Sequence, residues 1–327
     1  MRWDIFCQIV DNYGDAGICW RLARSLASIH GQEVRIFCDD LPILNLLASG
    51  VDPAIKQKID MQPWDASHSN ARHPVQTPDV VIEAFGCELP ERYLAGLFIA
   101  SIKPIIINLE YLSAEPWITE FHGKASPQSH GIPKYFFFPG FQKKVGGLLL
   151  DPIPAEGYLT NNDIPKDLKA SWSKLRPRAK RISIFCYPGA PLKKWLEDLG
   201  SLGEEVDVLL AHGHAEQLNL YGEQPLSLPT NIQLIYMPFV SQDEYDWVLS
   251  QCDFNIVRGE DSFIRAQLAG KPFIWHIYPQ DDCAHEVKLA AFLDLYLEEA
   301  SQELRLATIA AMTWAMPRIR TFRSVIG

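Results

Sequence analysis

The sequence predicts an α/β protein built from two doubly wound, Rossmann-like domains that face an interdomain cleft. Short apolar segments alternate with stretches of helical periodicity, and this alternation occurs in two series along the chain. A length of 327 residues with a hydrophobic content of 47% is enough for two cores. We therefore predict a first domain at residues 1–150, a linker at 151–180, a second domain at 181–300 and a C-terminal helix at 301–327 that packs back on the first domain.

The first series begins with a predicted strand at residues 3–10, a loop at 11–17 and a helical pattern at 18–29. Further apolar segments, each followed by a polar or proline-containing turn and a helical pattern, lie at 33–38, 80–83 and 105–109. Such an alternation is typical of a parallel sheet with helices on both faces. The predicted linker contains four prolines and few apolar runs.

The second series predicts five more strands, separated by helical segments. They lie at 181–187, 206–212, 232–237, 253–257 and 273–277. Residues 303–313 then have a helical pattern. Ligands of such folds bind outside the carboxyl ends of the strands, so we expect the functional residues in the loops that follow them.

The charge, the apolar runs and the cysteines of the chain exclude several classes of protein. A net charge of −10 without clustered Lys and Arg argues against a general nucleic-acid binder. The longest apolar runs are too short to span a bilayer and the first residues lack a signal-peptide profile, so we expect a cytoplasmic protein. Seven scattered cysteines contain no CxxC pair and are predicted to be buried thiols. Asp281, Asp282, Cys283 and His285 have no metal-ligand spacing, so no catalytic metal is predicted.

The segment 258–272 predicts a site for donor phosphates between a strand and a helix. A helix N-terminus at the carboxyl end of a strand attracts anions, and Arg258 and Ser262 suit a diphosphate. Asp261 or Ser262 is predicted to cap the helix. Glu260 does not suit a diphosphate and calls for another role, either orienting a sugar or supporting Asp15. The alternative is an ordinary capped helix.

The loop after the first strand places Asp11 and Asp15 on either side of Gly14. The spacing is not GxGxxG, and no Walker A sequence occurs in the chain. Both carboxylates can face the cleft, opposite Glu260. The alternative is structural, with an Asx-turn at Asp11 and a helix cap at Asp15.

Aromatic and polar side chains follow the strands of the second domain. Phe239 can stack on a base and Gln242 can read the base edge by hydrogen bonds. Tyr187 or Tyr245 can close the other face of such a site. For each of these residues, simple packing is the alternative.

Five blocks of the sequence resemble the EarP family, the arginine rhamnosyltransferases that modify translation elongation factor P. The blocks are VDNYGD at 10–15, WRLAR at 20–24, NLEYLSAE at 108–115, RGEDSFIRAQLAGKP at 258–272 and WHIYPQD at 275–281. The resemblance implies a GT-B glycosyltransferase that takes rhamnose from TDP-β-L-rhamnose, inverts the anomeric centre and attaches the sugar to one arginine of elongation factor P. The first domain would hold the acceptor protein, and no cofactor is implied.

Carried over by position, the resemblance implies that Asp15 is the base, Asp11 a nearby essential acid and Glu260 the acid of the RGEDS motif. The residues implied to hold the donor nucleotide are Phe239, Gln242 and Tyr245 at the thymine part, and Tyr187, Asp261 and Ser262 near the ribose and phosphates. After His285 the chain is shorter than the family's usual C-terminal part, which leaves the last helices unassigned.

Two other function classes compete with the transferase. A non-catalytic protein could use the same cleft to hold a nucleotide sugar or a basic translation-factor loop, but it has no need of Asp11 and Asp15. A glycosidase with two carboxylates gives no role to Phe239, Gln242 or the phosphate-binding turn.

Overall fold

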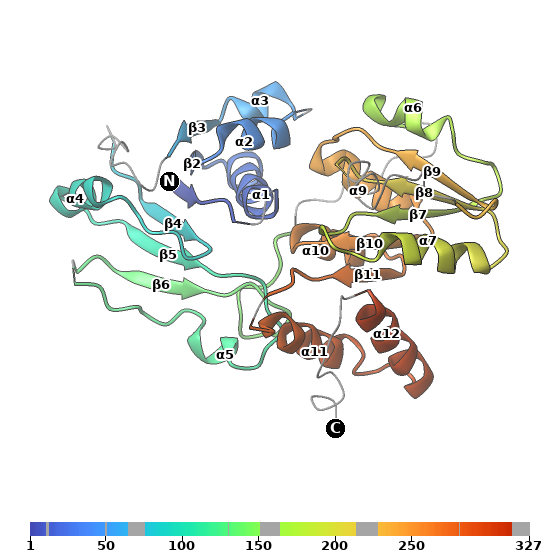
Figure 1. Ribbon diagram of the computed structural model, residues 1–327. Helices are drawn as coiled ribbons and strands as arrows, with labels where there is room; N and C mark the ends of the chain where they lie inside the picture. The colour runs from blue at the N-terminus through green and yellow to red at the C-terminus, as the bar shows by residue number, and fades with distance from the viewer. Residues whose placement is uncertain are drawn as a thin grey trace. The chain divides into compact units, whose positions relative to one another are not determined.

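The computed structural model describes residues 1–10, 13–49, 51–64, 76–129, 131–150, 164–213, 228–280 and 282–315. Figure 1 shows the chain as two α/β units, which comprise Met1–Pro152 and Ile153–Gly327. Each unit has one parallel sheet with helices packed against it. The predicted class of two Rossmann-like domains is confirmed in each unit. The cleft between them stays a prediction.

Unit 1 holds a six-stranded parallel sheet of order β3-β2-β1-β4-β5-β6. Its elements are β1 (Arg2–Cys7), α1 (Gly14–Ser28), β2 (Glu33–Cys38), α2 (Leu41–Leu47), α3 (Pro53–Lys56), β3 (Ile59–Pro63), β4 (Val80–Ala84), α4 (Glu91–Ile99), β5 (Ile105–Leu109), α5 (Ile118–Phe121) and β6 (Lys134–Phe137).

Unit 2 holds a five-stranded parallel sheet of order β11-β10-β7-β8-β9. Its elements are η1 (Lys166–Leu168), α6 (Lys169–Trp172), β7 (Lys180–Ile184), α7 (Leu192–Ser201), β8 (Val206–Leu210), β9 (Ile232–Tyr236), α9 (Gln242–Gln251), β10 (Phe254–Arg258), α10 (Asp261–Leu268), β11 (Phe273–His276), α11 (Ala284–Tyr296) and α12 (Gln302–Trp314).

All nine predicted strands are present, and the sequence analysis missed two more. The missed strands, β3 and β6, form the two edges of the unit 1 sheet. Strand β3 has the sequence IDMQP and β6 has KYFF, so neither has the buried apolar run that marks an inner strand. Edge strands tolerate charges and proline because one side of their backbone has no neighbouring strand.

The core of unit 1 surrounds an ion pair. Asp4 on β1 is fully buried and accepts two hydrogen bonds from Arg35 on β2, at 2.7 and 2.6 Å. Tyr93 on α4 donates its hydroxyl to the same carboxylate. Phe6 stacks on Phe37 beside this group, with ring centroids 4.4 Å apart. These contacts join β1, β2 and α4 and so fix the strand that leads to Asp15.

The core of unit 2 contains an aromatic stack beneath the turn between β10 and α10. Phe263 on α10 stacks on Trp275 of β11 at 3.9 Å and meets Phe292 of α11 edge-on at 4.7 Å. Burial of such rings stabilises a fold through both apolar area and ring geometry. The stack therefore ties three elements to one another below the turn.

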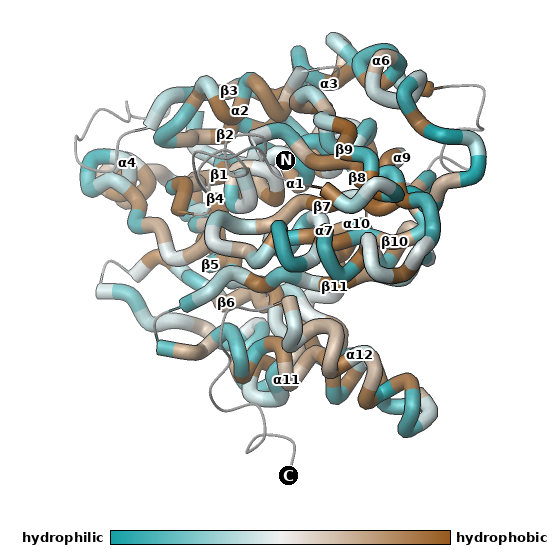
Figure 2. The backbone as a smooth tube through the Cα atoms, turned by 45° about the vertical axis from the view of Figure 1, so that its right-hand side comes forward, coloured by the Kyte–Doolittle hydropathy of each residue, from teal (hydrophilic) through white to brown (hydrophobic). Residues whose placement is uncertain are grey.

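The C-terminal helix α12 packs on the sheet of unit 2. The sulfur of Met312 accepts a hydrogen bond from the backbone nitrogen of Trp275 at 3.1 Å. The ring of Trp314 lies 5.6 Å, centroid to centroid, from the ring of Trp195 on α7. Figure 2 shows hydrophilic and hydrophobic segments alternating along this helix, of which only Met312 is buried. The packing of the segment 301–327 back on the first domain stays a prediction, because residues 316–327 lie outside the described residues, as do residues 151–163 of the predicted linker.

No helix among the described residues is long and apolar enough to cross a membrane.

We predict that Phe263→Ala lowers the free energy of unfolding by about 3–5 kcal/mol, because the change leaves a cavity between Trp275 and Phe292. Urea unfolding followed by tryptophan fluorescence measures this loss. Phe98→Ala is the matched control, since Phe98 is 55% exposed and its loss should cost less than about 0.5 kcal/mol. Equal stability of the two variants would contradict the proposed packing.

Candidate functional site

The turn that carries Glu260 is fixed by its neighbours. Gly259 has a φ of +66°, a left-handed conformation that glycine adopts without strain. Its carbonyl accepts a hydrogen bond from the indole nitrogen of Trp275 at 3.0 Å. The Glu260 carboxylate accepts a hydrogen bond from the Lys288 ammonium on α11 at 2.7 Å. These two side chains are only 12% and 20% exposed, so the ion pair is largely shielded from solvent.

The predicted cap of α10 was wrong. Glu260 occupies the N-cap position without a side-chain cap, and Asp261 lies in the first turn of the helix together with Ser262. The Glu260 side chain reaches Lys288 instead of the helix backbone. The helix N-terminus keeps its partial positive charge, which is the feature that the phosphate-site prediction needs, although the carboxylate of Asp261 lies in the first turn.

Arg258 ends β10 and lies over two aromatic rings. Its guanidinium carbon is 4.3 Å from the ring centre of Phe185 and 4.8 Å from that of Tyr187, and Nη1 donates to the carbonyl of Cys186 at 3.3 Å. Stacking on aromatic faces restricts an arginine while leaving other N–H groups for an anion. The guanidinium is therefore held in place at the carboxyl end of the sheet.

Tyr187 is 3% exposed, and the guanidinium of Arg258 packs on its ring. Its backbone nitrogen donates to Nδ1 of the buried His276 at 3.1 Å. Tyr278 meets the ring edge-on at 5.1 Å. The prediction that Tyr187 contacts the donor is untested, and its burial favours a supporting role.

Gln242 and Asp261 join the N-termini of α9 and α10. The Gln242 amide nitrogen donates to the Asp261 carboxylate at 3.2 Å. One turn further along the helices, buried Arg265 donates to buried Asp246 at 2.8 Å. Removing one member of a buried pair is costly, so this contact restrains the two helices relative to each other. Two of the predicted donor residues are thus brought together.

Phe239 and Tyr245 follow β9 in different environments. Phe239 is half-buried and lies edge-on to His212 at 6.2 Å. Tyr245 turns its hydroxyl into the unit 2 core, where burial raises the pKa of that phenol, and its ring meets Phe185 at 5.7 Å. A hydroxyl that is buried in this way leaves only the half-exposed ring for contact with a ligand.

Asp15 lies in the first turn of α1, and its side chain turns back toward the preceding loop. One carboxylate oxygen accepts a hydrogen bond from the backbone nitrogen of Val10 at 2.8 Å, and the residue is 2% exposed. A carboxylate is stabilised at a helix N-terminus. Asp11, the other predicted carboxylate of this loop, lies outside the described residues.

Six of the seven cysteines are buried, as predicted, but Cys283 is exposed. It adopts a left-handed conformation, with a φ of +61°, immediately before α11. Burial raises the pKa of Cys87, Cys186 and Cys252 to about 12, which disfavours the thiolate at neutral pH.

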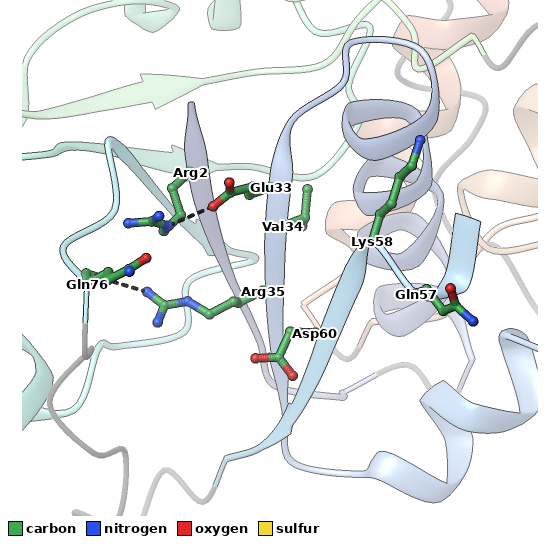
Figure 3. Close-up of a pocket in the computed structure, with 8 residues that line it drawn as sticks. All are labelled: Arg2, Glu33, Val34, Arg35, Gln57, Lys58, Asp60 and Gln76. Atoms are coloured by element: carbon green, nitrogen blue, oxygen red, sulfur yellow. Dashed lines mark hydrogen bonds and ion pairs between the residues drawn. The ribbon is translucent and has the colours of Figure 1, made fainter. Parts of the chain in front are cut away.

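Within the described residues, no three His, Cys, Asp or Glu side chains lie close enough to hold a metal ion. A cavity of about 240 Å³ lies near the amino ends of β1, β2 and β3 (Figure 3). Three of its charged side chains are paired, since Arg2 contacts Glu33 at 3.0 Å and Arg35 contacts Asp4. It lies at the edge of the sheet opposite to the carboxyl ends, where the predicted site residues are found.

Over residues 3–321 the chain matches the family model described as Elongation-Factor P (EF-P) rhamnosyltransferase EarP. The chain belongs to the EarP family. Curated relatives are named protein-arginine rhamnosyltransferase. One from Pseudomonas putida is 42% identical over 309 residues, covering 90% of this chain and 81% of the relative. One from Shewanella oneidensis is 37% identical over 344 residues, covering 96% and 84%.

Solved structures agree with the assignment to the EarP family. One, described as the structural basis for EarP-mediated arginine glycosylation of translation elongation factor EF-P, is 31% identical with a TM-score of 0.62, covering 96% of this chain and 84% of that chain. An S. aureus MnaA solved with UDP is 11% identical with a TM-score of 0.51, covering 97% and 92%, and shows the fold alone. The predicted GT-B class and the prediction of a glycosyltransferase are confirmed.

Sequence reasoning missed three residues that shape this EarP-family site. Lys288, Trp275 and His276 contact Glu260, Gly259 and Tyr187, respectively. Trp275 and His276 were predicted only as part of a strand and of a block that resembles the family, and nothing in the helical pattern of 284–296 marks Lys288 as a partner of Glu260. A contact between residues 28 positions apart depends on how α11 packs.

We predict that Asp15→Ala lowers the free energy of unfolding by about 1–2 kcal/mol, because the backbone nitrogen of Val10 loses its acceptor. Asp15→Asn keeps an oxygen that can accept this bond and should lose less than about 1 kcal/mol. Chemical denaturation of both variants measures the difference. A larger loss in Asp15→Asn than in Asp15→Ala would contradict this role of the hydrogen bond.

Proposed function

We propose that the chain transfers rhamnose from TDP-β-L-rhamnose to an arginine side chain of translation elongation factor P, with inversion at the anomeric carbon. Membership of the EarP family, together with relatives named protein-arginine rhamnosyltransferase, supports arginine as the acceptor. The observation that carries the proposal is the shielded carboxylate of Glu260 beside Arg258 and the N-terminus of α10. We further propose that the reaction takes place in the cytoplasm.

The donor nucleotide is proposed to lie along the carboxyl edge of the unit 2 sheet. Phe239 stacks on the thymine and the half-exposed ring of Tyr245 lies near it. Gln242, joined to Asp261, contacts the base edge. Arg258 and the first turn of α10, with Ser262, face the diphosphate. Their N–H groups stabilise the charge that develops when TDP leaves.

The acceptor chemistry sets the role of the carboxylates. A guanidinium has a pKa above about 12, whereas an aspartate has a pKa of about 4. Transfer of a proton from the guanidinium to an aspartate before the reaction is therefore strongly unfavourable. Asp15 and Asp11 instead hold the guanidinium by hydrogen bonds. Asp15 accepts a proton as the carbon–nitrogen bond forms, when the acidity of the nitrogen has risen. Glu260 orients the sugar.

Each bond change in the proposed step is accounted for. The arginine nitrogen attacks the anomeric carbon, the bond between this carbon and the diphosphate oxygen breaks, and TDP leaves with the electron pair. The proton that the nitrogen loses passes to Asp15. A single displacement of this kind inverts the configuration, so a β-linked donor gives an α-linked product. Membership of a glycosyltransferase family agrees with this scheme.

We predict that the purified protein adds one deoxyhexose to unmodified elongation factor P when TDP-rhamnose is present, as measured by intact-mass spectrometry. Asp15→Asn should lose at least about 100-fold in rate, because general-base and positioning groups contribute about 10²–10⁴-fold. The matched control is Asp198→Asn, an exposed carboxylate that pairs with Lys194 and should leave the rate unchanged. Binding of TDP-rhamnose without any mass gain would favour a non-catalytic binding protein.

We predict that Phe239→Ala weakens TDP binding by about 5- to 150-fold, since stacking of a base on an aromatic ring contributes about 1–3 kcal/mol. Isothermal titration calorimetry with TDP alone measures this change without the acceptor protein. Phe98→Ala, an exposed position of unit 1, should bind TDP as the unsubstituted protein does. Unchanged affinity in Phe239→Ala would place the base elsewhere.

A further inference from the structure

Helix α11 brings a lysine to the carboxylate of Glu260. The Lys288 ammonium donates to Oε1 of Glu260 at 2.7 Å, and both side chains are mostly buried. Charged hydrogen bonds of this length are among the stronger ones in proteins. By contrast, the side chains of the ion pair between Lys194 and Asp198 are 60% and 44% exposed, and such a pair stabilises the fold little.

The position of Lys288 is set by the packing of α11. Leu289 is fully buried, and Phe292, one turn beyond Lys288, packs against both Phe263 and Trp275. Before the helix, the backbone nitrogen of Gln280 donates to Nδ1 of His285 at 3.0 Å. The helix is therefore anchored at its start and along its buried face, so Lys288 is presented to Glu260 from a rigid element.

The backbone of Glu260 is fixed from the other side. The carbonyl of Gly259 is held by Trp275, and the carbonyl of Glu260 accepts the backbone nitrogen of Ile264 at 3.0 Å. These bonds set the direction of the Cα–Cβ bond of Glu260 but leave its side-chain torsions open. The ammonium of Lys288 supplies a fixed point for the carboxylate itself.

We propose that Lys288 is a positioning residue for the transfer reaction, which holds the Glu260 carboxylate toward the rhamnose of the donor. The proposal rests on the proposed function, since it assigns Glu260 to orienting the sugar. Lys288 acts through Glu260 and does not itself contact the diphosphate. A lysine suits this task because its compact ammonium can hold a single carboxylate oxygen.

The test compares steady-state kinetics of Lys288→Met, Lys288→Arg and the unsubstituted protein, with TDP-rhamnose as the varied substrate and elongation factor P as the acceptor. We expect Lys288→Met to lower kcat at least about 10-fold while the KM for the donor changes less than about threefold. Lys288→Arg keeps a cation and should recover at least about half of kcat. Lys194→Met is the matched control and should behave as the unsubstituted protein does.

A double-variant cycle distinguishes a positioning role from an independent one. If Lys288 acts through Glu260, then Lys288→Met added to Glu260→Gln should lower kcat no further than Glu260→Gln alone. Affinity for TDP and the unfolding midpoint are measured for every variant. If Lys288→Met does not fold, Lys288→Gln, which retains a hydrogen-bond donor without the charge, replaces it in the same comparisons.

Several results would overturn the proposal. A raised donor KM with unchanged kcat would mean that Lys288 contacts the donor directly. Unchanged kcat and KM in Lys288→Met would mean that the contact between Lys288 and Glu260 is only structural. If Lys288→Met lowers kcat as much in the Glu260→Gln background as in the unsubstituted protein, Lys288 does not act through Glu260. In each case the unsubstituted protein still transfers the sugar. If that protein transfers none, the proposed function and this inference fail together.

Discussion

A left-handed glycine and a shielded ion pair hold the turn between β10 and α10, and the donor half of the site depends on them. Gly259 lets the chain reverse direction so that its carbonyl meets the Trp275 indole, and Lys288 then fixes the carboxylate that follows. The same indole stacks on Phe263, which begins the buried face of α10. The packing of the core and the geometry of the turn therefore depend on the same side chain, Trp275. A change in either shifts Glu260.

The other residues proposed to bind the donor in unit 2 are also held by contacts within the protein. Arg258 is stacked on two rings, and α9 and α10 are joined by the Gln242 contact at their N-termini and the Asp246 pair along their length. Groups held in this way need little rearrangement to meet a charged transition state. In unit 1 the carboxylate of Asp15 is likewise oriented by the protein, through the hydrogen bond from the backbone nitrogen of Val10.

Much of this could be predicted from the sequence, and the failures have physical causes. Inner strands such as Ile105–Leu109 were placed correctly because parallel strands buried on both faces are apolar throughout. The edge strands β3 and β6 carry polar residues and were missed. The loop carboxylates stay a prediction, which rests on the rule that ligands of this fold bind at strand ends. Lys288 was missed because its contact with Glu260 arises only from tertiary packing of α11, and the burial of Tyr187 has the same origin.

The central claim is that the sugar passes directly from the nucleotide to arginine while the carboxylates orient the reactants and accept the proton. Nuclear magnetic resonance of the modified elongation factor P peptide tests this claim most directly, through the configuration at the anomeric carbon of the attached rhamnose. A single displacement from a β-linked donor predicts an α-linked product. A β-linked product would contradict the account, because a single in-line displacement cannot retain the configuration of the donor.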